Sequence, residues 1–217
     1  MGISSAFAQM RKACVDKIVA QLNLDNSSVF MDIGSGLGDV VFEVADRYGC
    51  KSVGIELHPR LFQETALVMG NVNAGLYPWI KSVNFVFGDA EAVLTKTGLA
   101  PCTHLYLFSK CMTKKLIQNI GKIANSCSSL LMVTSYHDLP SLGWQRLKLH
   151  DTVRAQLRGS GEGASMKIYQ VEQAYFIPPV IPHWLPDHER QYDSGSWLDL
   201  ANSFQLPRTR SQVAKIN

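Results

Sequence analysis

Hydrophobic and polar positions repeat along this chain with two periods, one typical of helices and one typical of strands. Apolar residues recur every three or four positions over residues 5–22, 37–49, 58–74 and 114–124, which predicts amphipathic helices. Short apolar runs predict buried strands at residues 27–33, 51–57, 83–89, 103–108 and 128–136. Because single helices separate strands, we expect parallel pairing through right-handed crossovers.

The pattern changes near the C-terminal third of the chain. Residues 144–157 and 164–176 are two long strand-like segments, and the glycine-rich stretch "RGSGEG" between them can join antiparallel strands. The predicted fold class is therefore α/β, with a seven-stranded, mostly parallel sheet and a C-terminal antiparallel hairpin. We expect residues 1–177 to form this domain and residues 178–217, proline-rich with a basic end, to form an arm outside it.

Three glycines follow the first predicted strand. The stretch "DIGSGLGD" places Gly34, Gly36 and Gly38 after Asp32, where the chain enters a helix. Glycine permits tight turns and close approach of the backbone to a ligand. The dinucleotide fingerprint is G-x-G-x-x-G, but here the third glycine comes one residue early. Because the carboxylate of Asp32 would repel a pyrophosphate, the pattern favours a ligand with positive charge.

Two further acids follow the next two strands. Glu56 ends the second predicted strand, where a carboxylate can accept both hydroxyls of a ribose. Asp89 follows the third strand, where it can accept a hydrogen bond from an adenine amino group. With Asp32 these acids outline a nucleoside with a positive tail, which S-adenosylmethionine fits. A nicotinamide dinucleotide fits less well, because no second domain would hold a hydride acceptor. The other alternative is a Rossmann-like domain whose glycines only pack helix against strand.

This constellation resembles the class I S-adenosylmethionine-dependent methyltransferases, whose Rossmann-like sheet also has seven strands and a reversed final hairpin. Within that class, "DIGSGLGDVVFEVA", "SVGIE", "FGDAEA" and "LLMVTSY" resemble the disruptor-of-telomeric-silencing (DOT1-like) family, histone-lysine methyltransferases without a SET domain. The resemblance implies a methyltransferase that binds S-adenosylmethionine and releases S-adenosylhomocysteine. The cofactor-binding residues that it implies are Asp32, Gly34, Ser35, Gly36, Gly38, Glu56, Leu57, Asp89 and Ala90.

The chain departs from this family on the acceptor side. The family has two asparagines after the fourth strand, whereas this chain has "LFSKCM", which places Phe108 and Ser109 there. By resemblance, Tyr169 corresponds to a tyrosine that lines the lysine channel. We take Phe108, Ser109 and Tyr169 as the candidate catalytic residues. A lysine acceptor must lose its proton, and an apolar channel lowers its pKa toward that state.

The resemblance predicts a protein lysine substrate, in a histone or nucleosome, and a nuclear protein. RNA methylation is an alternative, although "FSKCM" lacks the Asp/Asn-Pro-Pro-aromatic loop typical of enzymes that methylate exocyclic amino groups. Lys110, Lys114 and Lys115 follow the fourth strand and can either meet phosphates or be ordinary solvated lysines. Because the asparagines are missing, a degenerate domain that serves as a scaffold is a further alternative.

Composition changes this picture little. Hydrophobic residues make up 46% of the chain, enough for a full core, and a net charge of +3 permits an acidic partner without demanding one. Five cysteines without metal-ligand spacing indicate reduced thiols in an intracellular protein. The histidines show no ligand spacing, so no metal is expected. The N-terminus does not resemble a signal peptide, and no apolar run reaches membrane-spanning length.

Overall fold

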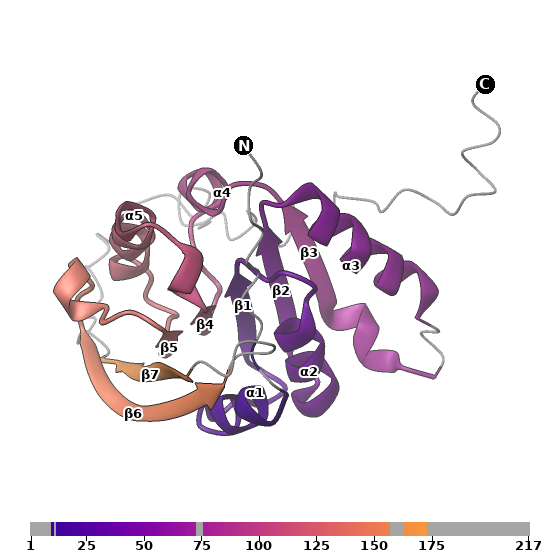
Figure 1. Cartoon of the computed structure of the whole chain (residues 1–217), viewed down its shortest axis with the longest axis horizontal. Coiled ribbons are helices and arrows are strands. Elements are labelled where there is room, and N and C mark those ends of the chain that lie inside the picture. The colour runs from indigo at the N-terminus through magenta and orange to yellow at the C-terminus, as the bar shows by residue number, and fades with distance from the viewer. Residues whose placement is uncertain (1–9, 11, 73–75, 157–162, 173–217) are drawn as a thin grey trace, which may run out of the picture.

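A computed structural model describes residues 10, 12–72, 76–156 and 163–172 (Figure 1). Its centre is one seven-stranded sheet with the strand order β3-β2-β1-β4-β5-β7-β6. The strands are β1 (Val29–Ile33), β2 (Lys51–Glu56), β3 (Val83–Phe87), β4 (His104–Leu107), β5 (Met132–Ser135), β6 (Leu147–Gln156) and β7 (Gly163–Val171). Strands β1 to β5 pair in parallel, and β7 is antiparallel to both β5 and β6. The predicted fold class is confirmed, whereas the expected arm, residues 178–217, lies outside the described residues.

Five helices connect the strands of the described chain. They are α1 (Lys12–Val19), α2 (Asp39–Tyr48), α3 (Pro59–Asn71), α4 (Ala90–Thr97) and α5 (Lys114–Asn125). Three short 3₁₀ helices accompany them, η1 (Pro78–Ser82), η2 (Ser109–Cys111) and η3 (Pro140–Leu142). The hydrophobic pattern did not predict α4, because it has only eight residues. Its start is set by Asp89, whose side chain accepts a hydrogen bond from the backbone N–H of Ala92 over 2.9 Å.

The helices cover both faces of the sheet. Met31 and Ile33 of β1 belong to the apolar core that includes Leu94 of α4 and Ile117 of α5. Phe30 points to the opposite face, where the second core includes residues of α1 and α2. Helix α3 packs beside α2 through the third cluster, which joins it to β3. The side chain of Asp32 therefore lies on the face of α1 and α2, because alternate residues of a strand share a face.

The final hairpin packs on α1 with one side, and on the other side only Leu147, Tyr169 and Val171 join the first core. Ala155, Ala164, Met166 and Ile168 are buried in the core that contains α1. On the other side, η3 is the only helical turn between β5 and β6. The connection that carries η3 folds back onto α5, where the indole N–H of Trp144 donates a hydrogen bond to the carbonyl of Ile117 over 3.0 Å.

Candidate functional site

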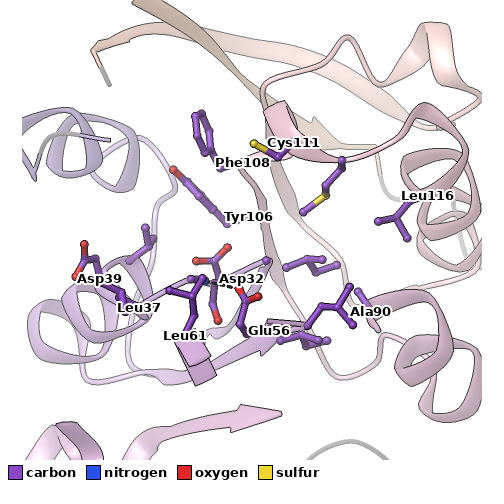
Figure 2. Close-up of a pocket in the computed structure, with 18 of the residues that line it drawn as sticks. Asp32, Leu37, Asp39, Glu56, Leu61, Ala90, Tyr106, Phe108, Cys111 and Leu116 are labelled. Carbon is purple, nitrogen blue, oxygen red and sulfur yellow. Dashed lines mark hydrogen bonds between the residues drawn. The ribbon is translucent and has the colours of Figure 1, made fainter. Parts of the chain in front are cut away.

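A cavity of about 380 Å³ opens at the carboxyl ends of the parallel strands. It lies between β1 and β4, where the strand order reverses, which is where open α/β sheets bind ligands. Its volume lies within the usual range for small-molecule sites. Its walls come from α1, the β1–α2 turn, β2, α3, the starts of α4 and α5, and β4 with the turn that follows it (Figure 2).

The glycine turn after β1 is fixed to the second strand. The backbone N–H of Gly34 donates a hydrogen bond to the carbonyl of Ile55 over 2.8 Å, and that of Gly36 donates to the carboxylate of Glu56 over 2.7 Å. Gly36 has a φ of +59°, and a Cβ atom built there would meet no other atom within 4 Å. Because Gly36 also lines the cavity, its bare backbone leaves space for a ligand.

Asp32 brings a carboxylate into the cavity, whereas the hydroxyl of Ser35 packs behind the glycine turn, against Gly54 of β2. The carboxylate of Asp32 is nearly buried, in a residue 3% exposed, and accepts no hydrogen bond from the residues that the structure describes. The hydroxyl of Ser35 is buried and likewise lacks a partner there. Burial, and then the charge of Glu56, raise the pKa of Asp32 well above its ordinary value. A ligand with donors and positive charge would satisfy the carboxylate of Asp32.

The side chain of Glu56 is held in a fixed orientation. One carboxylate oxygen accepts the N–H of Gly36 and the other accepts the N–H of His58, each over 2.7 Å. A carboxylate oxygen can accept more than one hydrogen bond, so both remain able to accept ligand hydroxyls. Figure 2 shows the carboxylates of Glu56 and Asp32 side by side at the floor of the cavity.

The remaining predicted cofactor residues divide into those that line the cavity and one that does not. Leu57, Asp89 and Ala90 line it, as predicted from their strand ends. Gly38 does not, since a Cβ atom there would lie 2.6 Å from the ring of Phe85. The structure shows instead that the bare backbone of Gly38 lets the start of α2 pack closely against Phe85 of β3, and its role toward a cofactor stays a prediction.

The candidate acceptor side is an apolar wall. Phe108 lines the cavity beside Tyr106, Cys111 and Met112 (Figure 2). The ring of Phe108 packs edge-on against Tyr136, with centroids 6.3 Å apart. Sequence reasoning missed Tyr106, although strand register could have found it, because Tyr106 of β4 pairs directly with Asp32 of β1. Burial, and then the charge of Asp32, raise the pKa of Tyr106.

Ser109 and Tyr169 are not among the residues that line this cavity, and their catalytic role stays a prediction. Ser109 is fully buried, and its hydroxyl lies 2.8 Å from Nδ1 of His137 and 3.2 Å from the hydroxyl of Ser135. Tyr169 is 1% exposed, and its hydroxyl donates to the carboxylate of Asp138 over 3.1 Å. Ser109 therefore links the ends of β4 and β5, and Tyr169 closes the core under η3.

Three comparisons with known proteins bear on this arrangement. Residues 3–79 match the sequence model of the family "Histone methylation protein DOT1". A Cryptococcus neoformans "Histone-lysine N-methyltransferase, H3 lysine-79 specific" is 40% identical over 58 residues, which are 27% of this chain and 9% of that protein. An RNA methyltransferase from Salinibacter ruber superposes with a TM-score of 0.54 and 23% identity, over 76% of this chain and 94% of its own.

The tRNA methyltransferase-like Sp1610 from Streptococcus pneumoniae also superposes with a TM-score of 0.54, at 12% identity, over 76% of this chain and 72% of its own. This chain has the class I methyltransferase fold. Its first third resembles DOT1. The DOT1-like segment contains Asp32, Gly36 and Glu56 but ends before Asp89 and Phe108. It therefore covers one half of the methyltransferase cavity and leaves the candidate acceptor side unmatched.

Two further findings concern the described residues of this methyltransferase fold. None of their His, Cys, Asp and Glu side chains gather in groups of three that could hold a metal ion. Among the same residues, no helix combines the length and the apolar character needed to cross a membrane. None of the five cysteines, all of which the structure describes, forms a disulfide, and Cys111 is exposed at the cavity.

Proposed function

We propose that the chain binds S-adenosylmethionine in this cavity and transfers its methyl group to a lysine side chain of a protein, a histone in the nucleus. The observation that carries the cofactor proposal is the buried carboxylate of Asp32, which no described residue supplies with a hydrogen bond, beside the open backbone of Gly36. A buried carboxylate without a donor is costly unless a ligand supplies one. A dinucleotide phosphate would add repulsion there, whereas a cationic nucleoside removes the cost.

Each part of the cofactor has a complementary group in the cavity. Asp32 would face the cationic methionine end, and Glu56 would accept the ribose hydroxyls. Asp89 keeps one carboxylate oxygen on the start of α4 and would offer the other to the adenine amino group, next to Ala90. When bound, S-adenosylmethionine supplies an electrophilic methyl group and leaves as S-adenosylhomocysteine.

The apolar wall supports an amine acceptor. Tyr106, Phe108 and Met112 surround the side of the cavity next to β4. Removal from water disfavours a charged lysine, so this wall would lower its pKa and expose a lone pair for the methyl group. The wall would also align the lone pair with the methyl carbon, which is most of what such a displacement requires from a protein. The aromatic faces would attract the product cation.

RNA is the second candidate acceptor, favoured by the solved structures named as RNA methyltransferases. These superpose over about three quarters of the chain. The DOT1 match, in contrast, stops at residue 79 and says nothing of that side. The family match that supports a lysine acceptor therefore covers only the cofactor-binding half of the fold. The identity of the acceptor is decided by experiment.

One labelling experiment separates the candidates. The full chain is incubated with methyl-labelled S-adenosylmethionine and offered nucleosomes, free histones or total RNA in separate reactions. The lysine proposal predicts label in histone protein that survives nuclease treatment. Label confined to RNA would overturn the lysine proposal and keep the cofactor proposal. A chain that gives no binding heat and no thermal shift with the cofactor would be a scaffold.

A further inference from the structure

We infer that the exposed face of the β6–β7 hairpin, with the start of α5, binds the phosphodiester backbone of a nucleic acid. This surface, called the hairpin surface below, lies beyond the methyl-transfer cavity and does not depend on the proposed function. Its residues are Lys114, His137, Thr152, Arg154, Ser165 and Lys167.

The hairpin surface exists because, among the described residues, no helix covers this side of the hairpin toward its turn, beyond Tyr169. Residues of β6 and β7 alternate between buried apolar side chains facing α1 and polar side chains facing away from it. Thr152, Arg154 and Ser165 are exposed, and Lys167 is half-buried. The connection from β5 to β6 contains only η3 and folds toward α5 instead of covering these residues.

Strand register gathers these side chains into one cluster. Thr152 pairs with Lys167, and Arg154 pairs with Ser165, so each cation has a hydroxyl as its cross-strand neighbour. Directly opposed residues of antiparallel strands have their Cβ atoms about 4.5–5.5 Å apart. On the other edge of β7, Lys167 pairs with Ser135 at the end of β5. The cluster thus extends from the hairpin to the strand end beside the cavity.

His137 connects the hairpin cations to the start of α5. Its Nδ1 atom is held 2.8 Å from the hydroxyl of Ser109, which fixes the ring at the end of β5. Burial lowers the pKa of His137, and the positive charges of Lys114 and Lys167 lower it further. Lys114 follows Thr113, a residue that lines the cavity.

Among the described residues, the cations of the hairpin surface form no ion pair. The ion pairs of these residues lie on α1, α2 and α3, as in Arg47 with Asp16. The acids nearest along the chain, Asp138 and Asp151, accept hydrogen bonds from Tyr169 and from the N–H of Thr152 and keep their charge. An external anion would therefore find three cations, Lys114, Arg154 and Lys167, that no described carboxylate engages directly.

The combination of side chains favours phosphodiester over other anions. Arg and Lys together with Ser and Thr hydroxyls are the groups that contact nucleic-acid phosphates. Arg154 can present its planar fork to a phosphate, and the neighbouring hydroxyls can donate further hydrogen bonds. The position beside the cavity mouth would let a strand bound here pass the acceptor side.

The test compares two triple variants of the full chain without cofactor. The first, Lys114→Gln/Arg154→Gln/Lys167→Gln, removes three cations of the hairpin surface. The second, Lys17→Gln/Lys51→Gln/Lys81→Gln, removes three exposed cations elsewhere and changes the net charge equally. Fluorescent RNA and duplex DNA are titrated at several salt concentrations. The single reversal Arg154→Glu, at an exposed position, gives an independent variant with little effect on folding.

We expect the first variant to bind at least about tenfold more weakly, with the slope of log affinity against log salt reduced by about 2 to 3. The second variant should bind like the unchanged chain. Equal binding by the first variant, or equal weakening of both, would overturn the inference. Displacement of RNA and DNA by polyglutamate at equal charge concentration would also overturn it, because the surface would then fit an acidic polypeptide. None of these outcomes depends on whether the chain binds the cofactor.

Discussion

The backbone N–H of Gly36 donates a hydrogen bond to the carboxylate of Glu56 over 2.7 Å, which ties the glycine turn of β1 to the end of β2. Two features that lie twenty residues apart in the sequence thus form one rigid corner of the cavity. This corner leaves the backbone of Gly36 facing open space. The relationship allows a sharp test, because a second glycine has the same conformation away from the cavity.

Gly36→Ala and Gly49→Ala should cost similar stability but differ in cofactor binding. Gly36 has a φ of +59° and Gly49 a φ of +65°, and neither would place a Cβ atom within 4 Å of another atom. An alanine in this left-handed region costs about 1–2 kcal/mol. We expect both variants to lose about that much in chemical denaturation. Only Gly36→Ala should lose affinity for S-adenosylhomocysteine, by about tenfold or more, and equal affinities would contradict the placement of the ligand.

Asp32→Asn should make the free protein more stable and the complex weaker. Folding raises the pKa of Asp32, so the folded chain holds this proton to a higher pH than the unfolded chain. Above the ordinary pKa, the free energy of unfolding therefore falls as the pH rises toward the folded pKa. The amide removes this cost, and each kcal/mol gained raises the Tm by about 2–4 °C.

The same variant should bind S-adenosylmethionine about 10- to 100-fold more weakly, because a hydrogen bond to a charged group contributes about 1.5–3 kcal/mol. Asp46→Asn, at an exposed position of α2, is the matched control and should change neither quantity. A loss of stability in Asp32→Asn, or unchanged affinity, would show that Asp32 does not face the cofactor.

Cofactor affinity should fall as the pH is lowered. The raised pKa of Asp32 means that a fraction of the free chain is protonated above the ordinary carboxyl range. A cationic ligand needs the ionised form, so binding takes up the carboxylate, releases a proton and weakens as the pH falls through the raised pKa of Asp32. Calorimetry in two buffers of different ionisation enthalpy measures this proton. Asp32→Asn should abolish the release, and an unchanged release would assign it to another group.

Ser109→Ala should lower stability and leave cofactor affinity unchanged. The variant removes the hydroxyl that contacts His137 and Ser135 in a buried position. An unsatisfied buried polar group costs about 1–3 kcal/mol, which urea denaturation would detect. Ser141→Ala, at an exposed position, is the control and should have a much smaller effect. Lost methyl transfer at unchanged stability would support a catalytic role for Ser109.

Much of the fold could be predicted from the sequence because the parallel strands are continuous apolar runs. Helix α4 was missed, since its eight residues form only about two turns, too few for a repeat of apolar positions to be recognised. The acids at the strand ends were found because each one follows an apolar run directly. Asp32, Glu56 and Asp89 all line the cavity.

The acceptor side was predicted less well because it depends on contacts between distant segments. Tyr106 lies within an apolar strand and reads as core until strand register places it beside Asp32. Tyr169 was assigned by resemblance alone, and the hairpin turns its side chain into the core under Leu139. Gly38 belongs to the glycine motif, yet its neighbour Phe85 comes from β3 and is invisible to a local pattern.

The most direct test of the central claim is calorimetric titration of S-adenosylmethionine into the full chain and into Asp32→Asn. We expect one molecule to bind per chain, with a dissociation constant in the micromolar to millimolar range usual for such ligands. The affinity of Asp32→Asn should be clearly lower. Saturable heat of equal strength in both proteins, or no heat from the unchanged chain, would contradict it.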